Sequence, residues 1–504
     1  MPWLRPSRMF IELVPRFTAA REARGAHLAS RFSLGNLSFP GYKHFAPSAL
    51  GPMSNLTQLR IAVREIFDAA LQAVDGGDAV RRAVQFSGSS LRICDLEVDA
   101  ANQKIYSIAI GKASSSMAVA LEDRIGERFA EGLIAGPISG QPRGRDLAIT
   151  PRKLSTRWRW CEGGHPLPNK KSLIAASEAF ALLERANKER ALVVFLISGG
   201  GSAMIEWPIS EDITLADLRM ANKALIRCGA SIGEINSVRR AFSAVKGGKL
   251  SARAPDCDQI TLIVSDVPEG EERNVASGPT LAPPPDAPKA FDVLAKYNLR
   301  GQLPAPALRA IETEISEPAD AGALRVRKHF VLLSNNTALE AAAEAARKRG
   351  FGTEIAADVS DQPIEEGCEQ LRERLEALRA KHRHPDSIVC LISGGEFACP
   401  VNGDGIGGRN LETALRLAGS TDLSLSDTVA LCAGTDGMDG NSPAAGAIID
   451  STTMERAKSI GLDANDFLRR SDSYSFFVTL GDVITTGVTG TNVRDLRVLL
   501  ARAK

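Results

Sequence analysis

The sequence predicts an α/β fold, and three observations support this prediction. Apolar runs of strand length alternate with segments of helical period from Ser54 onward, in the order of parallel βαβ units. The runs are apolar at nearly every position, as in strands that are buried on both faces of a sheet. Glycine and charged residues follow the ends of these runs, where open parallel sheets bind their ligands. We therefore expect two such domains, the second one smaller, with a cleft between their facing edges.

The expected elements of the first domain, residues 53–325, follow from these patterns. Strands are expected at 104–110, 191–197 and 259–265, and helices at 113–127, 170–186, 214–229 and 232–253. Five prolines between 279 and 288, and a softer break at 314–323, place the domain boundary near residue 325. In the second domain, residues 326–504, strands are expected at 329–334, 387–392 and 428–434, with helices at 338–348 and from Arg409 onward.

The composition is that of an ordinary globular protein. With 504 residues, of which 44% are hydrophobic, the chain is long enough for about two to four domains. Its net charge of +1 creates no overall field that would attract nucleic acid or an anionic membrane. The eight cysteines are scattered without a CxxC spacing, which indicates a reducing compartment and no structural zinc. No apolar run approaches the roughly 20 residues that cross a bilayer, so we expect a cytoplasmic protein.

Residues 1–52 differ from the rest of the chain, because they contain seven Arg or Lys residues and only two acidic ones. Two interpretations stay open. One is a targeting leader, with mitochondrial targeting as an alternative to the cytoplasm. The other is that translation begins at Met53, where a capped amphipathic helix opens. Both interpretations place this segment outside the fold.

Two of the expected strands end in Ser-Gly-Gly, within the segments FLISGGGSA and CLISGGEFA. Successive glycines let the backbone bring its amides close to a ligand, and a following serine adds a hydroxyl. The alternative is a tight turn that contains glycine for backbone reasons alone. Because the pattern occurs twice, we expect a site for phosphate or another anion. The residues concerned are Gly199, Gly200, Gly201 and Ser202.

Charged residues stand directly after the expected strands, in the segments IGKAS, VSDV, SGGE and AGTDGMDG. Sparse carboxylates near a phosphate loop suit Mg²⁺, because this ion binds one or two protein carboxylates together with water and phosphate oxygens. Each acid alone is equally consistent with a solvated loop residue or a helix cap. The basic residue is Lys112, and the candidate metal ligands are Asp266, Glu396, Asp436 and Asp439.

Two further groups of residues are candidates for binding anions. Arg409 follows Gly407 and Gly408 at the start of a helix, which places a guanidinium and free amides together. The alternative for this residue is an ordinary surface arginine. The expected helix 232–253 carries further candidates, although we expect much of its charge to be solvated. These candidates are Asn236, Arg239 and Lys246.

Several other chemistries are disfavoured. The nucleophile elbow GxSxG is missing, and His165 in GGHPLP is the one histidine that accompanies a glycine motif, which argues against a serine hydrolase. Zinc chemistry lacks an HExxH motif and clustered His or Cys residues. Calcium lacks the EF-hand spacing around AGTDGMDG.

Taken together, ten segments in order make the chain resemble the class II glycerate 2-kinases, whose C-terminal half is known as the MOFRL domain. The resemblance covers residues 57–499. It implies a Rossmann-like domain and a smaller α/β domain, with the active site in the cleft between them. The segments are IGKAS, GGHPLPN, FLISGGGSA, LIRCGASIGEINSVRR, SAVKGGKL, VSDV with ASGPT, LISGGE, GDGIGGRNLETAL, AGTDGMDG with AAGAIID, and TGVTGTNV.

The resemblance also implies an activity, namely transfer of the γ-phosphoryl group of ATP to the 2-hydroxyl of D-glycerate, with ATP and Mg²⁺ as cofactors. The active-site lysine and arginine proposed for such enzymes match Lys112 and Arg409. We hypothesise that the glycine amides hold the phosphates, and that these two cations stabilise the moving phosphoryl group and the glycerate carboxylate. The identity of the base, the position of the phosphate on the product and the choice between monomer and homodimer stay open.

The chain departs from the family pattern as we know it at three places. Ala241 replaces a histidine, the stretch 268–275 reads PEGEERNV instead of a GDD-like sequence, and Val488 replaces a proline. These departures put the choice of substrate and the fine geometry of the metal site in doubt. Another small hydroxy acid is therefore an alternative acceptor.

Two rival functions are considered. A nicotinamide-dependent hydroxypyruvate reductase is supported by Gly403, Gly405 and Gly408, which fit GxGxxG before a helix. Against it, the preceding segment contains Pro400 and is short, whereas a dinucleotide fold begins with a long buried strand. A non-catalytic sensor of small molecules would keep the cleft without the chemistry. The charged positions required for catalysis are all present, which favours an enzyme.

Overall fold

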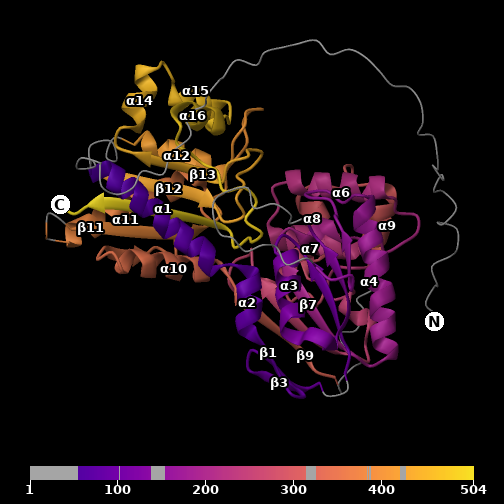
Figure 1. Cartoon of the computed structure of the whole chain (residues 1–504). Coiled ribbons are helices and arrows are strands. Elements are labelled where there is room, and N and C mark those ends of the chain that lie inside the picture. The colour runs from indigo at the N-terminus through magenta and orange to yellow at the C-terminus, as the bar shows by residue number, and fades with distance from the viewer. Residues whose placement is uncertain are drawn as a thin grey trace, which may run out of the picture. The chain divides into compact units, whose positions relative to one another are not determined.

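The computed structural model describes residues 55–100, 103–137, 154–313, 325–382, 384, 387–420 and 427–504. The segment 1–52, expected to be a leader or to precede the true start, lies outside these ranges. Residues 53–504 form one compact unit. Within the described ranges, every helix is too short or too polar to span a bilayer. Two six-stranded sheets organise this unit, together with a small antiparallel sheet of β1 (Val84–Ser87), β2 (Ser90–Ile93) and β3 (Leu96–Asp99) (Figure 1).

The first large sheet is parallel throughout, as expected. The predicted strands at 104–110, 191–197 and 259–265 are confirmed as three adjacent strands at its centre. Their side chains are buried on both faces, which explains why their sequences are continuously apolar. In spatial order the strands are β6 (Trp158–Cys161), β5 (Phe129–Ala135), β4 (Ile105–Ile110), β7 (Leu192–Ser198), β8 (Asp258–Val264) and β9 (Arg327–Leu333).

The strand β9 corrects the expected organisation of the chain. We expected a strand at 329–334 to open the second domain, but β9 pairs in parallel with β8, where Thr261 is opposite His329. The polar residues of β9 are tolerated because it is the edge strand and remains partly exposed. The first sheet therefore continues past residue 325 and ends at Leu333.

Helices cover both faces of the first sheet. α2 and α3 pack on the face that carries Leu192, Val194 and Leu196, whereas α4 packs on the face of Val193 and Phe195. A further apolar cluster joins α6 to α9. The helices of this half are α2 (Gly76–Ala83), α3 (Ser114–Ile125), α4 (Lys170–Lys188), α5 (Gly201–Met204), α6 (Leu215–Arg227), α7 (Ile232–Ala241), α8 (Ala290–Lys296) and α9 (Ala305–Glu312), with short 3₁₀ turns η2 (Gly126–Arg128), η3 (Ser251–Arg253) and η4 (Glu272–Ser277).

The helix expected at 232–253 is shorter than predicted, because α7 ends at Ala241. Beyond it, the Ser243 hydroxyl accepts hydrogen bonds from the amides of Val245 and Lys246, at 3.2 and 3.3 Å. The amide of Ala244 donates to the carbonyl of Trp207 instead of to the preceding turn. Lys246 consequently lies in a buried turn and not on a solvated helix face.

The second large sheet is mixed, so the parallel order expected from Ser54 onward is wrong for this half. The strands expected at 387–392 and 428–434 are confirmed as β11 and β12, but β15 lies between them and is antiparallel to both. The strand β13 is antiparallel to β12 on its other side. In spatial order the strands are β10 (Gly352–Ile355), β11 (Ile388–Gly395), β15 (Asp495–Arg502), β12 (Thr428–Gly434), β13 (Gly446–Asp450) and β14 (Val483–Ile484).

The first described helix, α1 (Asn55–Ala73), packs against the second sheet beside α10, although it precedes the first sheet in sequence (Figure 1). The opposite face of the second sheet is covered by α11 and α12. The helices expected at 338–348 and from Arg409 onward are confirmed as α10 and α12. The helices of this half are α10 (Asn335–Arg347), α11 (Ile364–Lys381), α12 (Arg409–Ala418), α14 (Thr453–Ser459), α15 (Ala464–Arg469) and α16 (Ser473–Leu480).

Candidate active site

The loops after β4 and β7 are joined at the carboxyl end of the first sheet. The amide of Lys112 donates to the carbonyl of Gly199 at 2.9 Å, and the amide of Ala113 donates to the hydroxyl of Ser198 at 3.0 Å. Gly200 has a φ of +78°, which L side chains rarely adopt. A methyl group there would lie 3.2 Å from the Lys112 side chain and 3.5 Å from the His165 ring. The turn therefore brings backbone, lysine and histidine close together.

Lys112 connects the two halves of the protein. Its ammonium lies 2.6 Å from a carboxylate oxygen of Asp436, in the loop after β12 of the second sheet. The two side chains are 21% and 19% exposed, so the pair is accessible to a ligand. This ion pair directly joins two loops that follow strands of the two large sheets.

Asp266 follows β8 and lies behind the glycine turn. Gly199 has no space for a side chain because a carboxylate oxygen of Asp266 occupies that position. The side-chain amide of Asn492 donates to the same oxygen at 3.3 Å. Burial raises the pKa of Asp266 to about 6, against the opposing effect of the Lys112 charge. The carboxylate is therefore destabilised and would gain from an additional cation.

Arg409 is held by two carboxylates of the second half. Its Nη2 lies 2.9 Å from Glu396, and its Nε donates to Asp495 at 2.7 Å. Burial disfavours the arginine cation, but the charges of Asp495 and Glu396 outweigh this effect and raise its pKa. Burial also raises the pKa of Glu396 to about 7; the positive charge of Arg409 lowers this pKa, and the negative charge of Asp495 raises it further. The guanidinium is thus not a free surface group.

Sequence reasoning missed Asp495. The residue begins β15 and lies opposite both Gly395 and Gly434, between the ends of β11 and β12. Only an antiparallel strand brings its first residue to the carboxyl ends of its neighbours, and the sequence was expected to form parallel units. The segment TGVTGTNV just before it was the available signal.

Asp439 serves as a helix cap, the alternative considered for the acidic residues. Its carboxylate accepts hydrogen bonds from the amides of Asn410 and Leu411 at 3.1 and 2.8 Å, in the first turn of α12. The residue is only 2% exposed. Among the described residues, no three His, Cys, Asp or Glu side chains gather in a metal-binding arrangement. The four candidate ligands therefore do not form a single cluster.

Ser202 and Asn236 belong to one hydrogen-bonded chain. The hydroxyls of Ser202 and Ser277 lie 2.7 Å apart, and Ser277 donates to the side-chain oxygen of Asn236 at 2.7 Å. The side-chain amide of Asn236 in turn donates to the carbonyl of Asn274 at 3.3 Å. This chain links the helix after the glycine turn to α7 and η4.

Lys246 and Arg239 are buried beneath this region. The ammonium of Lys246 contacts Glu206, whose other oxygen accepts a hydrogen bond from Ser243 at 2.6 Å. Burial lowers the pKa of Lys246. The Nε of Arg239 donates to Asn222 at 2.8 Å, and burial lowers the pKa of Arg239 to about 10. The sequence did not predict Glu206 or Asn222 as partners, because they lie far from Lys246 and Arg239 in the sequence and meet them only in the folded chain.

The glycines of GDGIGGR are explained by close packing. A side chain on Gly403 would meet the backbone of Arg470 at 2.5 Å, and one on Gly405 would meet Asp472 at 2.5 Å. Gly408 is closed off by Asp439. The amide of Gly407 donates to the side chain of Asn441 at 2.8 Å. These glycines lie in a loop and do not connect a strand directly to a helix as a dinucleotide fold requires.

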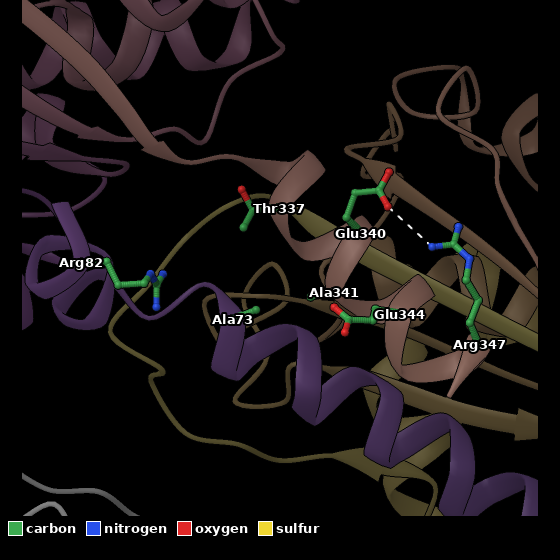
Figure 2. A pocket seen from close by; sticks show the side chains of 7 residues that line it. All are labelled: Ala73, Arg82, Thr337, Glu340, Ala341, Glu344 and Arg347. Carbon is green, nitrogen blue, oxygen red and sulfur yellow. Dashed lines mark ion pairs between the residues drawn. The ribbon is translucent and has the colours of Figure 1, made fainter. Parts of the chain in front are cut away.

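A separate pocket of about 600 Å³ lies between the end of α1, α2 and α10 (Figure 2). Four of its seven lining residues are charged, and two of them, Glu340 and Arg347, form an ion pair of 3.8 Å (Figure 2). None of the candidate site residues belongs to it. The lining residues are Ala73, Arg82, Thr337, Glu340, Ala341, Glu344 and Arg347.

Comparisons with known proteins give consistent matches along the chain. A family described as a domain of unknown function, DUF4147, matches residues 62–312, and the MOFRL family matches residues 389–495. A glycerate 2-kinase of Pyrococcus horikoshii is 34% identical over 442 residues, which cover 86% of this chain and 96% of the relative. A protein of Agrobacterium vitis, for which hydroxypyruvate reductase activity has been suggested, is 32% identical over 88% of this chain and 95% of its own. The crystal structure of a glycerate kinase from Thermotoga maritima matches with a TM-score of 0.69 and 29% identity, over 88% of this chain and 100% of that one.

Proposed function

We propose that this chain, which belongs to the family of glycerate 2-kinases that carry a MOFRL domain, transfers the γ-phosphoryl group of ATP to the 2-hydroxyl of D-glycerate. The resemblance inferred from the sequence motifs is thereby confirmed. The products are 2-phospho-D-glycerate and ADP. The observation that carries the proposal is the contact of Lys112 with Asp436, which places a lysine beside the glycine turn and between the two halves.

The proposed division of labour follows from the chemistry of phosphoryl transfer, in which a protein mainly positions the reactants and neutralises charge. The backbone at Gly199 to Gly201 supports the phosphates of ATP. The ammonium of Lys112 is accessible and stabilises the charge on the moving phosphoryl group. Ser202, whose hydroxyl is engaged with Ser277, positions the helix after the turn.

The carboxylates fit a magnesium ion in part. Mg²⁺ needs only one or two protein carboxylates. Asp266 and Glu396 suit this role because burial raises the pKa of both, and because the charge of Asp266 raises that of Glu396 further. A divalent cation held by Asp266 or Glu396 would relieve this destabilisation and would neutralise phosphate oxygens when bound. Asp436 and Asp439 are already engaged by Lys112 and by the first turn of α12.

We further propose that the protein works in the cytoplasm, as a monomer or homodimer, and without nucleic acid or membrane partners. These statements rest on its balanced charge, its scattered cysteines and the absence of a long apolar run in the sequence. Gel filtration with light scattering would decide the oligomeric state.

The activity is tested directly with the purified full-length protein. We expect ADP release from ATP and Mg²⁺ only when D-glycerate is present, and ³¹P NMR should identify the product as 2-phosphoglycerate. A signal of 3-phosphoglycerate would correct the position of transfer. A parallel reaction with hydroxypyruvate and NADH tests the reductase alternative, and oxidation of NADH without any ADP release would overturn the kinase proposal.

A further inference from the structure

Arg239 is a buried cation without an anionic partner in the described part of the chain. The residue is 8% exposed, and its Nε donates to the neutral side chain of Asn222 at 2.8 Å. Its charge is influenced by Glu206, but that carboxylate is already satisfied by Lys246 and by the hydroxyl of Ser243. Two buried cations thus share one carboxylate, and one positive charge is left over.

A buried charge without a counterion destabilises the folded protein, and a bound anionic ligand would supply that counterion. Removing a charged group from water without a counterion costs several kcal/mol, so buried charges are normally paired. Burial lowers the pKa of Arg239 to about 10, which still leaves it positively charged at neutral pH. A buried guanidinium that lacks a carboxylate is therefore poised to receive one from outside the protein.

The helix that carries Arg239 is connected to the glycine turn by hydrogen bonds. Asn236, three residues earlier on α7, is connected through Ser277 to Ser202, directly after the glycines. The loop that carries His165 packs against α5, the helix after the glycine turn, because Gly163 lies against the backbone of Met204. The charge of Arg239 reaches this loop, since it acts together with burial and Lys112 to lower the pKa of His165.

Arg409 offers a contrast. Both sides of its guanidinium face carboxylates of the protein, at 2.9 Å from Glu396 and 2.7 Å from Asp495. An incoming carboxylate would have to compete with these two or be repelled by them. Arg409 is therefore less suited to hold an anionic substrate than Arg239, contrary to our expectation from the sequence.

We infer that Arg239 binds the carboxylate of the acceptor substrate and thereby selects small 2-hydroxy acids over uncharged polyols. This inference rests on the proposed kinase function and assigns the recognition of the acceptor to the first half of the chain. The rival source of the anion is a phosphate of ATP, and the two sources differ in which substrate loses affinity when Arg239 is changed.

The test compares the Arg239→Gln variant with wild type on D-glycerate and on a substrate that lacks the carboxylate charge. For D-glycerate we expect kcat/KM to fall on the order of 100-fold, mostly through KM, because a buried charge pair loses one partner. For D-glyceramide, in which an amide replaces the carboxylate, the fall should be less than about threefold. The KM for ATP should stay within about threefold. Equal losses on the two acceptors, or a loss confined to ATP, would overturn the inference.

Two further variants serve as a control and as an independent test. Arg227→Gln removes one exposed positive charge from α6 and should leave all constants unchanged. Asn222→Asp places a carboxylate where Arg239 now meets a neutral oxygen at 2.8 Å, so it should raise the KM for D-glycerate by about tenfold or more even if Arg239→Gln does not fold. An unchanged KM in the folded Asn222→Asp variant would contradict the inference.

Calorimetric titration separates this inference from the proposed function. Wild-type protein that binds D-glycerate without phosphorylating it would remove the kinase proposal, and loss of that binding in Arg239→Gln would still support the role of Arg239. Binding of D-glycerate that is retained in Arg239→Gln would overturn the inference whatever the activity.

Discussion

Replacing Lys112 by Met removes the ammonium while keeping most of the side-chain stem that lies against Gly200. The Lys112–Asp436 pair is separated by 2.6 Å, which corresponds to an attraction of about 6 kcal/mol at an effective dielectric constant of about 20. Desolvation offsets most of this, so we expect the free energy of unfolding to fall by only about 1–2 kcal/mol. The kinetic effect should be larger, because the loss of one group that stabilises transition-state charge costs about 10²–10³ in kcat, or about 3–4 kcal/mol.

The assay couples ADP release to NADH oxidation at saturating ATP and D-glycerate, and urea unfolding measures stability in parallel. The matched control is Lys104→Met, which removes a lysine just before β4 whose pair with Glu189 spans 3.1 Å and is 63% and 40% exposed. This control should keep wild-type kcat. A folded Lys112→Met enzyme with kcat within about tenfold of wild type would refute the role assigned to the ammonium.

Three other predictions follow from the same geometry. Gly200→Ala and Gly270→Ala each place a methyl group on a residue with positive φ, of 78° and 87°, so each variant should lose about 1 kcal/mol of stability. Only Gly200→Ala should lower kcat, by about tenfold, because Gly270 faces open space. Burial raises the pKa of Asp266 to about 6, so the free energy of unfolding should fall as the pH rises from about 4 to 6, by about 1.4 kcal/mol per pH unit. Asp266→Asn should remove this slope, as measured by urea unfolding in the presence of EDTA. Identical slopes in the two proteins would contradict the assignment. Asp495→Asn should lower the free energy of unfolding in urea by about 1–3 kcal/mol, because Arg409 loses a buried anionic partner. An unchanged free energy of unfolding would argue against that pair.

The centre of the first sheet could be predicted from the sequence. The strands β4, β7 and β8 are continuously apolar and adjacent, so the residues that follow them were expected to lie together. The structure places Lys112, Gly199 and Asp266 at that edge. Their position follows from local pattern and from the rule that parallel strands end at one edge.

The rest depends on pairings that a local pattern does not encode. The apolar run of β15 is compatible with either strand direction, and its antiparallel direction is set by its neighbours β11 and β12. The same holds for Glu206, which meets Lys246 through tertiary packing. The helix predicted at 232–253 ends early, at Ala241, because the Ser243 hydroxyl accepts hydrogen bonds from backbone amides that a longer helix would use.

The position of β15 has a consequence for biosynthesis. It follows β11 and β12 in sequence and lies between them in the sheet, so these two strands are joined only after β15 has left the ribosome. Arg409 obtains its second carboxylate at the same moment. A chain terminated before β15 would present two unjoined strand edges to other chains, and such edges promote aggregation. Interrupted translation should therefore yield insoluble, inactive fragments and no partly active enzyme.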